Sequence, residues 1–268
     1  MGIINCTPDS FYDGGKNHSL SAALLTAESM IASNVDIIDI GGESSRPGSI
    51  RIDAEEEIER TVPLIKALKN DFPNVRISID TYKYDVVSAA IDAGADLIND
   101  IYAMRYDPKI ADVVSKNKLP ICLMHMKGTP ENMQFKPVYE GNVIDEINSF
   151  FSERISFSLD KGILPECIIL DPGVGFGKRY VDNLDILRDL ESFNIHERPL
   201  LVGTSRKSFI GKALNQEAAE RLEGSIAAAV ICVLNKAAIL RVHDVPETIN
   251  AVRLAEAVIG GRESVSYD

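Results

Sequence analysis

The sequence predicts a single-domain (β/α)8 TIM barrel spanning residues 1–268. Eight short apolar, β-branched runs alternate with longer amphipathic segments, which is the pattern of parallel strands joined by helices. The runs are continuously apolar, as expected for strands that are buried on both faces. An open doubly wound sheet shares this pattern, but the count of eight and a length near 250 residues favour the closed barrel.

Each expected strand is a short run rich in apolar, β-branched residues, and no low-complexity linker separates one part of the chain from another. The strands are therefore expected to follow one another at short intervals within one domain. They are Gly2–Ile4, Ile37–Ile40, Val75–Ile79, Leu97–Ile98, Pro120–Met124, Ile168–Leu170, Leu200–Val202 and Ile239–Val242.

Helices are expected between these strands. In Asp53–Phe72, apolar residues recur at spacings of three and four, and Pro63 within the pattern predicts a kink or a restart. The segment after Asp244 opens with a capping-box-like sequence and has proline in its first turn. Asn142–Lys161 and Glu220–Lys236 are predicted to be two further long helices.

The composition excludes some classes of partner. A formal net charge of -12 argues against a general electrostatic grip on nucleic acid or on an anionic membrane, although a local basic pocket is allowed. Neither a signal peptide nor a membrane-length apolar run is present, so a cytoplasmic protein is expected. The cysteines are expected to be buried reduced thiols, with a metal or disulfide site as the alternative. They are Cys6, Cys122, Cys167 and Cys232.

The stretch LDPGVGFGK, residues 170–178, looks like a phosphate-binding loop but matches neither standard nucleotide motif. A P-loop would need glycine where Pro172 stands and a hydroxyl residue where Arg179 stands. A dinucleotide fingerprint would place its third glycine at Lys178. The stretch is therefore interpreted as an apolar strand that ends in Asp171 and continues into a glycine-rich turn.

Polar residues end every expected strand, and in a barrel these ends converge on one mouth, where active sites lie. A single polar strand end often only satisfies loop backbone groups, but eight such ends together indicate a functional site. The residues are Asn5, then Asp39 with Glu43–Arg46, Asp80-Thr81, Asn99-Asp100, His125, Asp171, Ser205–Ser208, and Arg241 with His243.

The chemistry of these residues limits the ligand. Asp80, Asn99, Asp171 and Lys207 offer carboxylate acceptors, an amide and an ammonium donor, a set that suits a flat heterocycle with donors and acceptors around its rim. Met124, near the same mouth, is more typical of a packing residue but could flank a flat ring.

A second set of residues suits a phosphate or a diphosphate. Arg46, Arg241 and His243 are cationic or donor groups, and Asn5 adds an amide. Ser205–Ser208 is expected to begin a helix, whose backbone N–H groups can hold an anion. The absence of H-x-x-x-H and H-E-x-x-H motifs argues against a zinc site.

Eight segments of the sequence resemble the successive signature blocks of the dihydropteroate synthase family. They follow the family's order and span residues 1 to about 245, which makes the resemblance highly specific. The blocks are GIINCTPDSFYDGG, DIGGESSRPGS, SIDT, LINDI, CLMHMKGTP, ILDPGVGFGK, LVGTSRKSFIG and LRVHDV. The resemblance implies a (β/α)8 barrel, usually a homodimer, that joins 7,8-dihydropterin-6-ylmethyl diphosphate to 4-aminobenzoate and releases diphosphate. Sulfonamides compete for the aminobenzoate site in this family.

The resemblance also implies roles for individual residues. The pterin site would comprise Asp80, Asn99, Met124, Asp171, Phe176 and Lys207. The diphosphate would be held by Asn5, Arg46, Arg241 and His243, with Asn5 also a ligand of Mg²⁺. The aminobenzoate would be bound by Ser45, Arg46, Pro47, Lys207 and Ser208. The groups that act in catalysis would be Asn5, Lys207, Arg241 and His243.

The expected mechanism begins with cleavage of the bond between the pterin methylene and the diphosphate oxygen, followed by attack of the amine. The loops Thr7–Lys16 and Ser45–Arg51 are expected to close over the site. Ser45 departs from the family, which more often has threonine there. Two alternatives are a related pterin-binding methyltransferase that works with a corrinoid partner, and an inactive barrel that serves as a partner subunit.

Overall fold

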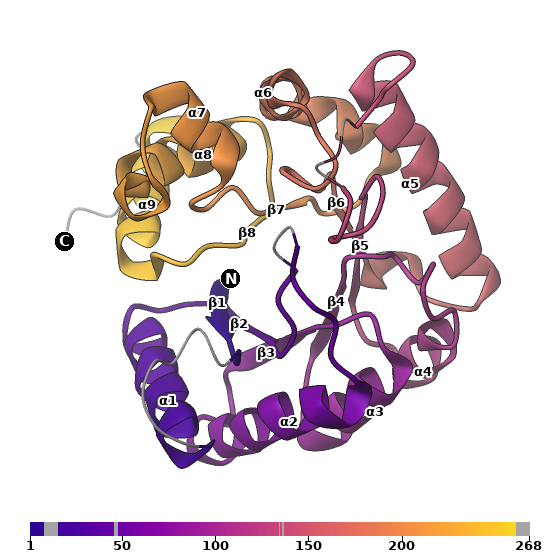
Figure 1. The fold of residues 1–268 in the computed structure, drawn as a ribbon, viewed down its shortest axis with the longest axis vertical. Helices are drawn as coiled ribbons and strands as arrows, with labels where there is room; N and C mark the ends of the chain where they lie inside the picture. Colours follow the sequence, from indigo (N-terminus) through magenta and orange to yellow (C-terminus); the bar gives the residue numbers. More distant parts are fainter. Residues whose placement is uncertain (8–15, 46–47, 134, 136, 261–268) are drawn as a thin grey trace.

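The computed structural model describes residues 1–7, 16–45, 48–133, 135 and 137–260. Its strands ring the centre of the molecule and its helices lie around them (Figure 1). The predicted strands are all confirmed, with ends shifted by one or two residues. They are β1 (Gly2–Asn5), β2 (Ile37–Gly41), β3 (Arg76–Asp80), β4 (Leu97–Asp100), β5 (Ile121–Met124), β6 (Ile168–Asp171), β7 (Leu201–Val202) and β8 (Ile239–Leu240).

The ring is made of two unequal parallel sheets. Strands β1 to β6 pair in chain order as one six-stranded sheet, and β7 pairs with β8. Single bridges join the two sheets, from Leu170 to Leu200 at one seam and from Gly2 to Val242 at the other. These bridges close the predicted (β/α)8 barrel and place all strand carboxyl ends at one mouth.

The helices alternate with the strands and cover the outside of the ring (Figure 1). The predicted long helices at 142–161 and 220–236 correspond to α5 and α8. Within the described part of the chain, 3₁₀ turns lie at Pro165–Cys167, Leu190–His196 and Ala218–Glu220. The α-helices are α1 (Lys16–Ala32), α2 (Ala54–Asp71), α3 (Tyr84–Ala93), α4 (Ile110–Asn117), α5 (Val143–Asp160), α6 (Tyr180–Arg188), α7 (Ser208–Leu214), α8 (Leu222–Leu234) and α9 (Val245–Gly260).

Helix α2 runs without interruption through Pro63, so the predicted restart is wrong. Asp53 caps its N-terminus, where the carboxylate accepts a hydrogen bond of 2.8 Å from the backbone N–H of Glu56. Thr61, Leu64, Ile65 and Leu68 are buried on both sides of the proline. Their packing on the sheet holds the helix together although Pro63 lacks a backbone donor.

Helix α9 begins where it was predicted. Pro246 lies in the first turn, and the Asp244 carbonyl accepts the first helical hydrogen bond, from the Thr248 N–H at 3.1 Å. The Asp244 carboxylate accepts from the Arg206 guanidinium, at 3.0 Å from Nε and 2.5 Å from Nη2, and so ties the loop after β8 to the loop after β7.

The barrel interior and the inner faces of the helices form one main core, to which every strand of the ring contributes apolar side chains.

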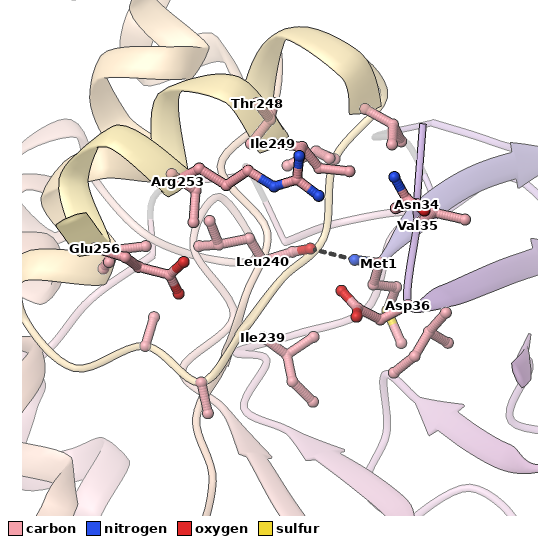
Figure 2. Close-up of a pocket in the computed structure, with 17 residues that line it drawn as sticks. Met1, Asn34, Val35, Asp36, Ile239, Leu240, Thr248, Ile249, Arg253 and Glu256 are labelled. Carbon is pink, nitrogen blue, oxygen red and sulfur yellow. Dashed lines mark hydrogen bonds between the residues drawn. The ribbon is translucent and has the colours of Figure 1, made fainter. Parts of the chain in front are cut away.

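All four cysteines are free thiols, and Cys122, Cys167 and Cys232 are buried. At the end of the barrel where the strands start, a cavity of about 480 Å³ lies between α9, β8 and the segment before β2 (Figure 2). Among the described residues, no helix has both the length and the apolar character to cross a bilayer.

Candidate active site

The ladder of the six-stranded sheet brings several predicted site residues to one level at the mouth of the barrel. Asn5 is in register with Gly41, Gly41 with Asp80, and Asp80 with Asn99. Asn5, Gly41 and Asp80 end their strands and Asn99 is the last residue but one of β4, and Gly41 has no side chain to separate its neighbours. The first four strands therefore present two amides and a carboxylate side by side.

Arg241, at the end of β8, crosses the mouth to the opposite sheet. Its Nε donates to Asp39 at 2.6 Å and its Nη2 donates to Asp80 at 2.6 Å. Burial raises the pKa of the Asp80 carboxyl to about 7, although the Arg241 charge opposes this shift. Arg241 was predicted to face a diphosphate, and the structure shows it also bound to two acids.

Asp39 was expected at the mouth of the barrel but without a role toward a ligand, and the structure places it against Arg241. It is fully buried on β2, accepts from Arg241, and accepts from the Asn99 side chain at 3.3 Å. Among the residues that the structure describes, none donates to its second oxygen. Its signal in the sequence was a lone acid inside an apolar strand, and a buried acid of this kind requires a partner.

Asp171 ends β6 and is buried. Its Oδ1 accepts a 2.7 Å hydrogen bond from the backbone N–H of Gly173, which fixes the orientation of the carboxylate. Burial raises its pKa, while this hydrogen bond and the nearby charges of Lys207, Lys178 and Arg241 act in the opposite direction. The predicted meeting of the β3, β6, β7 and β8 ends at one mouth is thus confirmed.

Lys207 lies at the start of α7 and points toward the turn after β6. Its Nζ donates to the Val174 carbonyl and lies 4.3 Å from the centre of the Phe176 ring. Burial lowers the pKa of Lys207 to about 8, which still leaves the ammonium mainly protonated at pH 7. Gly175 has φ +85, and a Cβ there would lie 2.9 Å from the lysine stem, so the close approach requires glycine.

Apolar side chains form a wall beside these polar groups. Met124 is buried in a small cluster that is separate from the main core, and Phe176 packs against the same cluster. Such a surface can contact the face of a flat ring, while Asp171, Asn99 and Lys207 reach its rim. The other members of the cluster are Tyr82, Ile101, Tyr102, Met126 and Met133.

The loops after β7 and β8 are joined to each other. The Ser205 hydroxyl lies 3.0 Å from His243 Nδ1 and accepts from the His243 backbone N–H at 3.2 Å. Arg206, which follows Ser205, forms an ion pair with Asp244, which follows His243. Ser208 is exposed as the first residue of α7. Of the second predicted set, His243 and the segment that contains Ser205 and Ser208 therefore lie side by side.

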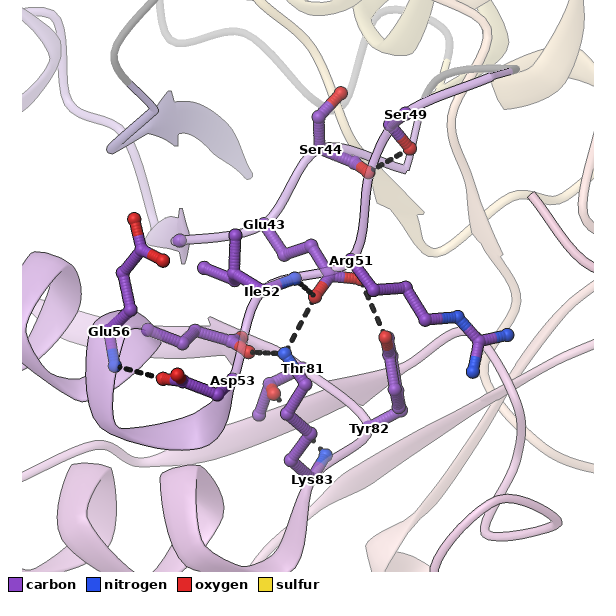
Figure 3. Close-up of polar contacts among 12 residues, drawn as sticks. Glu43, Ser44, Ser49, Arg51, Ile52, Asp53, Glu56, Thr81, Tyr82 and Lys83 are labelled. Atoms are coloured by element: carbon purple, nitrogen blue, oxygen red, sulfur yellow. Dashed lines mark hydrogen bonds and ion pairs between the residues drawn. The ribbon is translucent and has the colours of Figure 1, made fainter. Parts of the chain in front are cut away.

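The loop after β2 is anchored by a network of charges at its base (Figure 3). The Glu43 carboxylate accepts from the Tyr82 hydroxyl and from Lys83 Nζ, each at 2.6 Å, and from the Ile52 backbone at 3.1 Å. Lys83 also pairs with buried Glu57 at 2.6 Å. Ser45 is half-buried on this loop. Two residues predicted to bind ligands, Arg46 and Pro47, lie outside the described residues, as does most of the Thr7–Lys16 loop.

The mouth contains no ready-made metal cage. Among the described residues, no three histidine, cysteine, aspartate or glutamate side chains are grouped as metal ligands. Asn5, the predicted Mg²⁺ ligand, is half-buried at the end of β1 and offers one amide oxygen. One protein oxygen is a normal share for Mg²⁺ when phosphates and waters complete its shell.

The fold and the mouth together define a barrel enzyme that binds a flat heterocycle beside an anionic group. The chain matches the model of the pterin binding enzyme family over residues 1–243. It therefore belongs to the pterin-binding enzymes and, within them, to the dihydropteroate synthase family, as its relatives show.

The chain is 45% identical over 268 residues to the dihydropteroate synthase of Escherichia coli, a match that covers 100% of the chain and 94% of the relative. It is similar to the solved dihydropteroate synthase of Yersinia pestis in complex with a sulfonamide drug, with a TM-score of 0.91, 44% identity and coverage of 97% and 94%. It is also similar to the enzyme of Clostridium difficile solved in the presence of pteroic acid, with a TM-score of 0.90, 42% identity and coverage of 96% and 95%.

Proposed function

We propose that this chain, as one barrel domain over residues 1–268, condenses 7,8-dihydropterin-6-ylmethyl diphosphate with 4-aminobenzoate to give 7,8-dihydropteroate and diphosphate. The observation that carries the proposal is the convergence of Asp80, Asp171, Lys207 and Arg241 on one mouth. Membership of the dihydropteroate synthase family supports the same reaction.

The pterin ring is proposed to lie between the apolar wall and the buried acids. Asp171 would accept from two parallel donors on the pyrimidine edge, a geometry in which a carboxylate is strong. Asn99 would complete that edge, Asp80 would accept from the remaining edge, and the Lys207 ammonium would donate to a ring acceptor. The ring faces would contact Met124 and Phe176.

The diphosphate is proposed to lie beside the loops after β1, β2, β7 and β8, held by Asn5, Arg46, Arg241 and His243. Arg241 would reach the phosphate oxygens by sharing or exchanging its contacts with Asp39 and Asp80. Mg²⁺, with Asn5 as its protein ligand, would supply a positive charge next to the leaving oxygens. The protein's own contribution is the orientation of Arg241 and His243 toward that charge.

The aminobenzoate is proposed to bind at the outer side of the mouth, through Ser45, Arg46, Pro47, Lys207 and Ser208. Ser208, at the first position of α7, would receive the carboxylate, and the aliphatic stem of Lys207 would form one wall. Sulfonamides are proposed to compete at this position, since the relative from Yersinia pestis was solved with such a drug.

In the proposed mechanism the methylene C–O bond breaks first, and its electron pair leaves with the diphosphate. The electron-rich reduced pterin ring stabilises the cationic methylene. Arg241 and His243 stabilise the charge that develops on the leaving group, and one preorganised donor of this kind can be worth roughly 3 kcal/mol. The neutral arylamine then attacks the methylene and loses its proton, so no strong base is required beforehand.

A coupled assay for diphosphate release, with and without 4-aminobenzoate, tests this function. We expect release in the presence of both substrates, and slower release from the pterin substrate alone, because cleavage comes first. An absolute requirement for the amine in rapid-quench experiments would contradict the order of steps. Methyl transfer without diphosphate release would favour a corrinoid-dependent methyltransferase, and ligand binding without turnover would favour an inactive partner subunit.

We further propose a homodimer that forms through α8 and α9. These helices expose apolar side chains to solvent: Ile231 (44%), Leu234 (49%), Leu254 (68%), Val258 (74%) and Ile259 (50%). Exposed apolar side chains gathered on neighbouring helices are typical of an interface. Sedimentation analysis should give a dimer for the native chain and a monomer for Leu254→Asp combined with Val258→Asp.

A cytoplasmic location is proposed on the state of the cysteines. All four are free thiols. A reducing compartment preserves thiols of this kind.

A further inference from the structure

Lys178 is a buried cation to which the proposed reaction gives no task. It lies at the end of the turn after β6 and is only 3% exposed. Its ammonium lies 3.0 Å from His125 Nδ1 and donates to three carbonyls, those of His125 at 3.2 Å and of Gly173 and Phe176 at 3.0 Å each. These four atoms can each accept a hydrogen bond, so the side chain of Lys178 joins four acceptors.

These acceptors come from two segments that touch each other. A Cβ on Gly173 would lie 1.9 Å from the His125 carbonyl oxygen, and one on Gly177 would lie 2.1 Å from that of Lys127. The turn therefore lies directly on the backbone of the loop after β5. Lys178 Nζ donates to one carbonyl of the loop after β5 and to two carbonyls of the turn, so it bridges the two segments.

The protonation of the His125 ring is set by burial and by its contact with Lys178. Burial lowers the pKa of Lys178 to about 7, and below that pH the charged Nζ, 3.0 Å from His125 Nδ1, requires this ring nitrogen to be an acceptor. Burial and the Lys178 charge lower the pKa of His125 to about 2, so the ring stays neutral throughout the physiological range. Phe150 packs edge-on against it, with 5.0 Å between ring centres.

Three groups proposed to face the pterin depend on the position of the same turn. The Gly173 N–H orients the Asp171 carboxylate, and the Val174 carbonyl holds Lys207. The Phe176 ring lies under the Lys207 ammonium. Lys178 makes its contacts with the carbonyls of this turn, at the two residues that flank Val174 and Gly175.

We propose that Lys178 is a positioning residue for the pterin site, which acts by fixing the 173–176 turn against His125. The proposal rests on the proposed function for its substrate. It adds a determinant of pterin affinity that contacts no ligand itself.

The direct test replaces Lys178 by methionine, which keeps the length of the side chain and removes the ammonium. Leaving buried acceptors without a donor should raise KM for the pterin diphosphate by about tenfold or more, whereas KM for 4-aminobenzoate should change by less than about threefold. The matched control is Lys127→Met, because Lys127 makes a partly exposed pair with Glu146 and both KM values should stay within about twofold of the native ones.

Two further measurements keep the test decisive. Hydrogen–deuterium exchange of the 172–178 segment should be faster in Lys178→Met than in Lys127→Met, a result that does not depend on substrate. If Lys178→Met does not fold, His125→Leu and His125→Asn replace it, since asparagine keeps an acceptor near the ammonium and leucine does not. Leucine should raise the pterin KM and asparagine should restore much of the native value.

A native pterin KM in Lys178→Met, or in His125→Leu, would overturn the proposal. So would equal rises in the KM values of both substrates, which would indicate a general loss of structure. Native protein that releases no diphosphate would instead overturn the proposed function. The exchange comparison would still decide whether Lys178 holds the turn.

Discussion

The six-stranded sheet and the two-stranded sheet contribute opposite charges to the same mouth. Strands β1, β3, β4 and β6 end in an amide or an acid, among them Asp80 and Asp171, and β2 adds the buried Asp39. The segments around β7 and β8 supply the cations Lys207 and Arg241 and the imidazole of His243. Arg241 crosses between the sheets to bind two acids of the first sheet.

Arg241 and Asp80, which we propose to bind the substrate, therefore also join the two sheets. The two sheets meet through one bridge at each seam, so backbone pairing is sparse there. The ion pairs of Arg241 with Asp39 and Asp80 add a side-chain link between the two sheets at the mouth of the barrel. Substitutions of Arg241, Asp39 or Asp80 should therefore affect both stability and catalysis. Substitutions of residues whose contacts stay within one sheet should affect mainly one of these two properties.

The largest effect is expected from Arg241→Met, which breaks the link between the sheets. Two buried acids lose their partner, a change that typically costs about 3–5 kcal/mol. The loss of a donor to the leaving group should lower kcat/KM by roughly 10²–10³-fold. Urea unfolding and the diphosphate assay measure the two effects. A variant with lost activity and native stability would show that the pairs do not hold the sheets together.

The pH dependence of stability sharpens the same comparison. The pKa of Asp80 is raised from 3.8 to about 7, so the folded protein retains a proton that the unfolded chain has lost. Its contribution is therefore complete below pH 3.8 and is lost as the pH rises through about 7. Asp80→Asn should flatten this decline in the free energy of unfolding. Parallel pH profiles for the native chain and Asp80→Asn would contradict the shift.

A smaller effect is expected for the pair between Arg206 and Asp244, which lies entirely on the two-stranded side. Its guanidinium is 41% exposed, and pairs of this kind contribute up to about 1 kcal/mol. Asp244→Asn should lower stability by no more than this amount and kcat by a few-fold, because Arg206 adjoins Lys207. Arg188→Gln, which removes an exposed pair on α6, is the control. A loss of stability and activity as large as that of Arg241→Met would contradict the difference between a pair on one side and the pairs that join the two sheets.

The smallest effect is expected from Ser45→Thr on the six-stranded side. One added methyl group is worth about 0.8 kcal/mol when it is buried, which corresponds to about fourfold in affinity. We expect sulfonamide inhibition to strengthen by up to this factor while stability stays unchanged. Identical inhibition constants for both proteins would make the serine irrelevant to drug packing.

Much of the fold followed from the sequence, because eight buried parallel strands leave a plain apolar pattern. The strand-end acids were also visible, since a polar residue after each apolar run is a local feature. The network around Lys178 was not, because the β6 turn and the β5 loop meet only in the folded chain. The pair between Asp244 and Arg206 was not visible for the same reason, because the loops after β7 and β8 meet only in the folded chain.

The single-bridge seams have a practical consequence. A cut at the exposed Glu197–Arg198 link would leave β1 to β6 on one polypeptide and β7 and β8 on the other. Such fragments should recover activity when mixed, because the charges that attract the substrate also attract the two pieces to each other. The enzyme could then serve as a split reporter whose signal depends on reassembly.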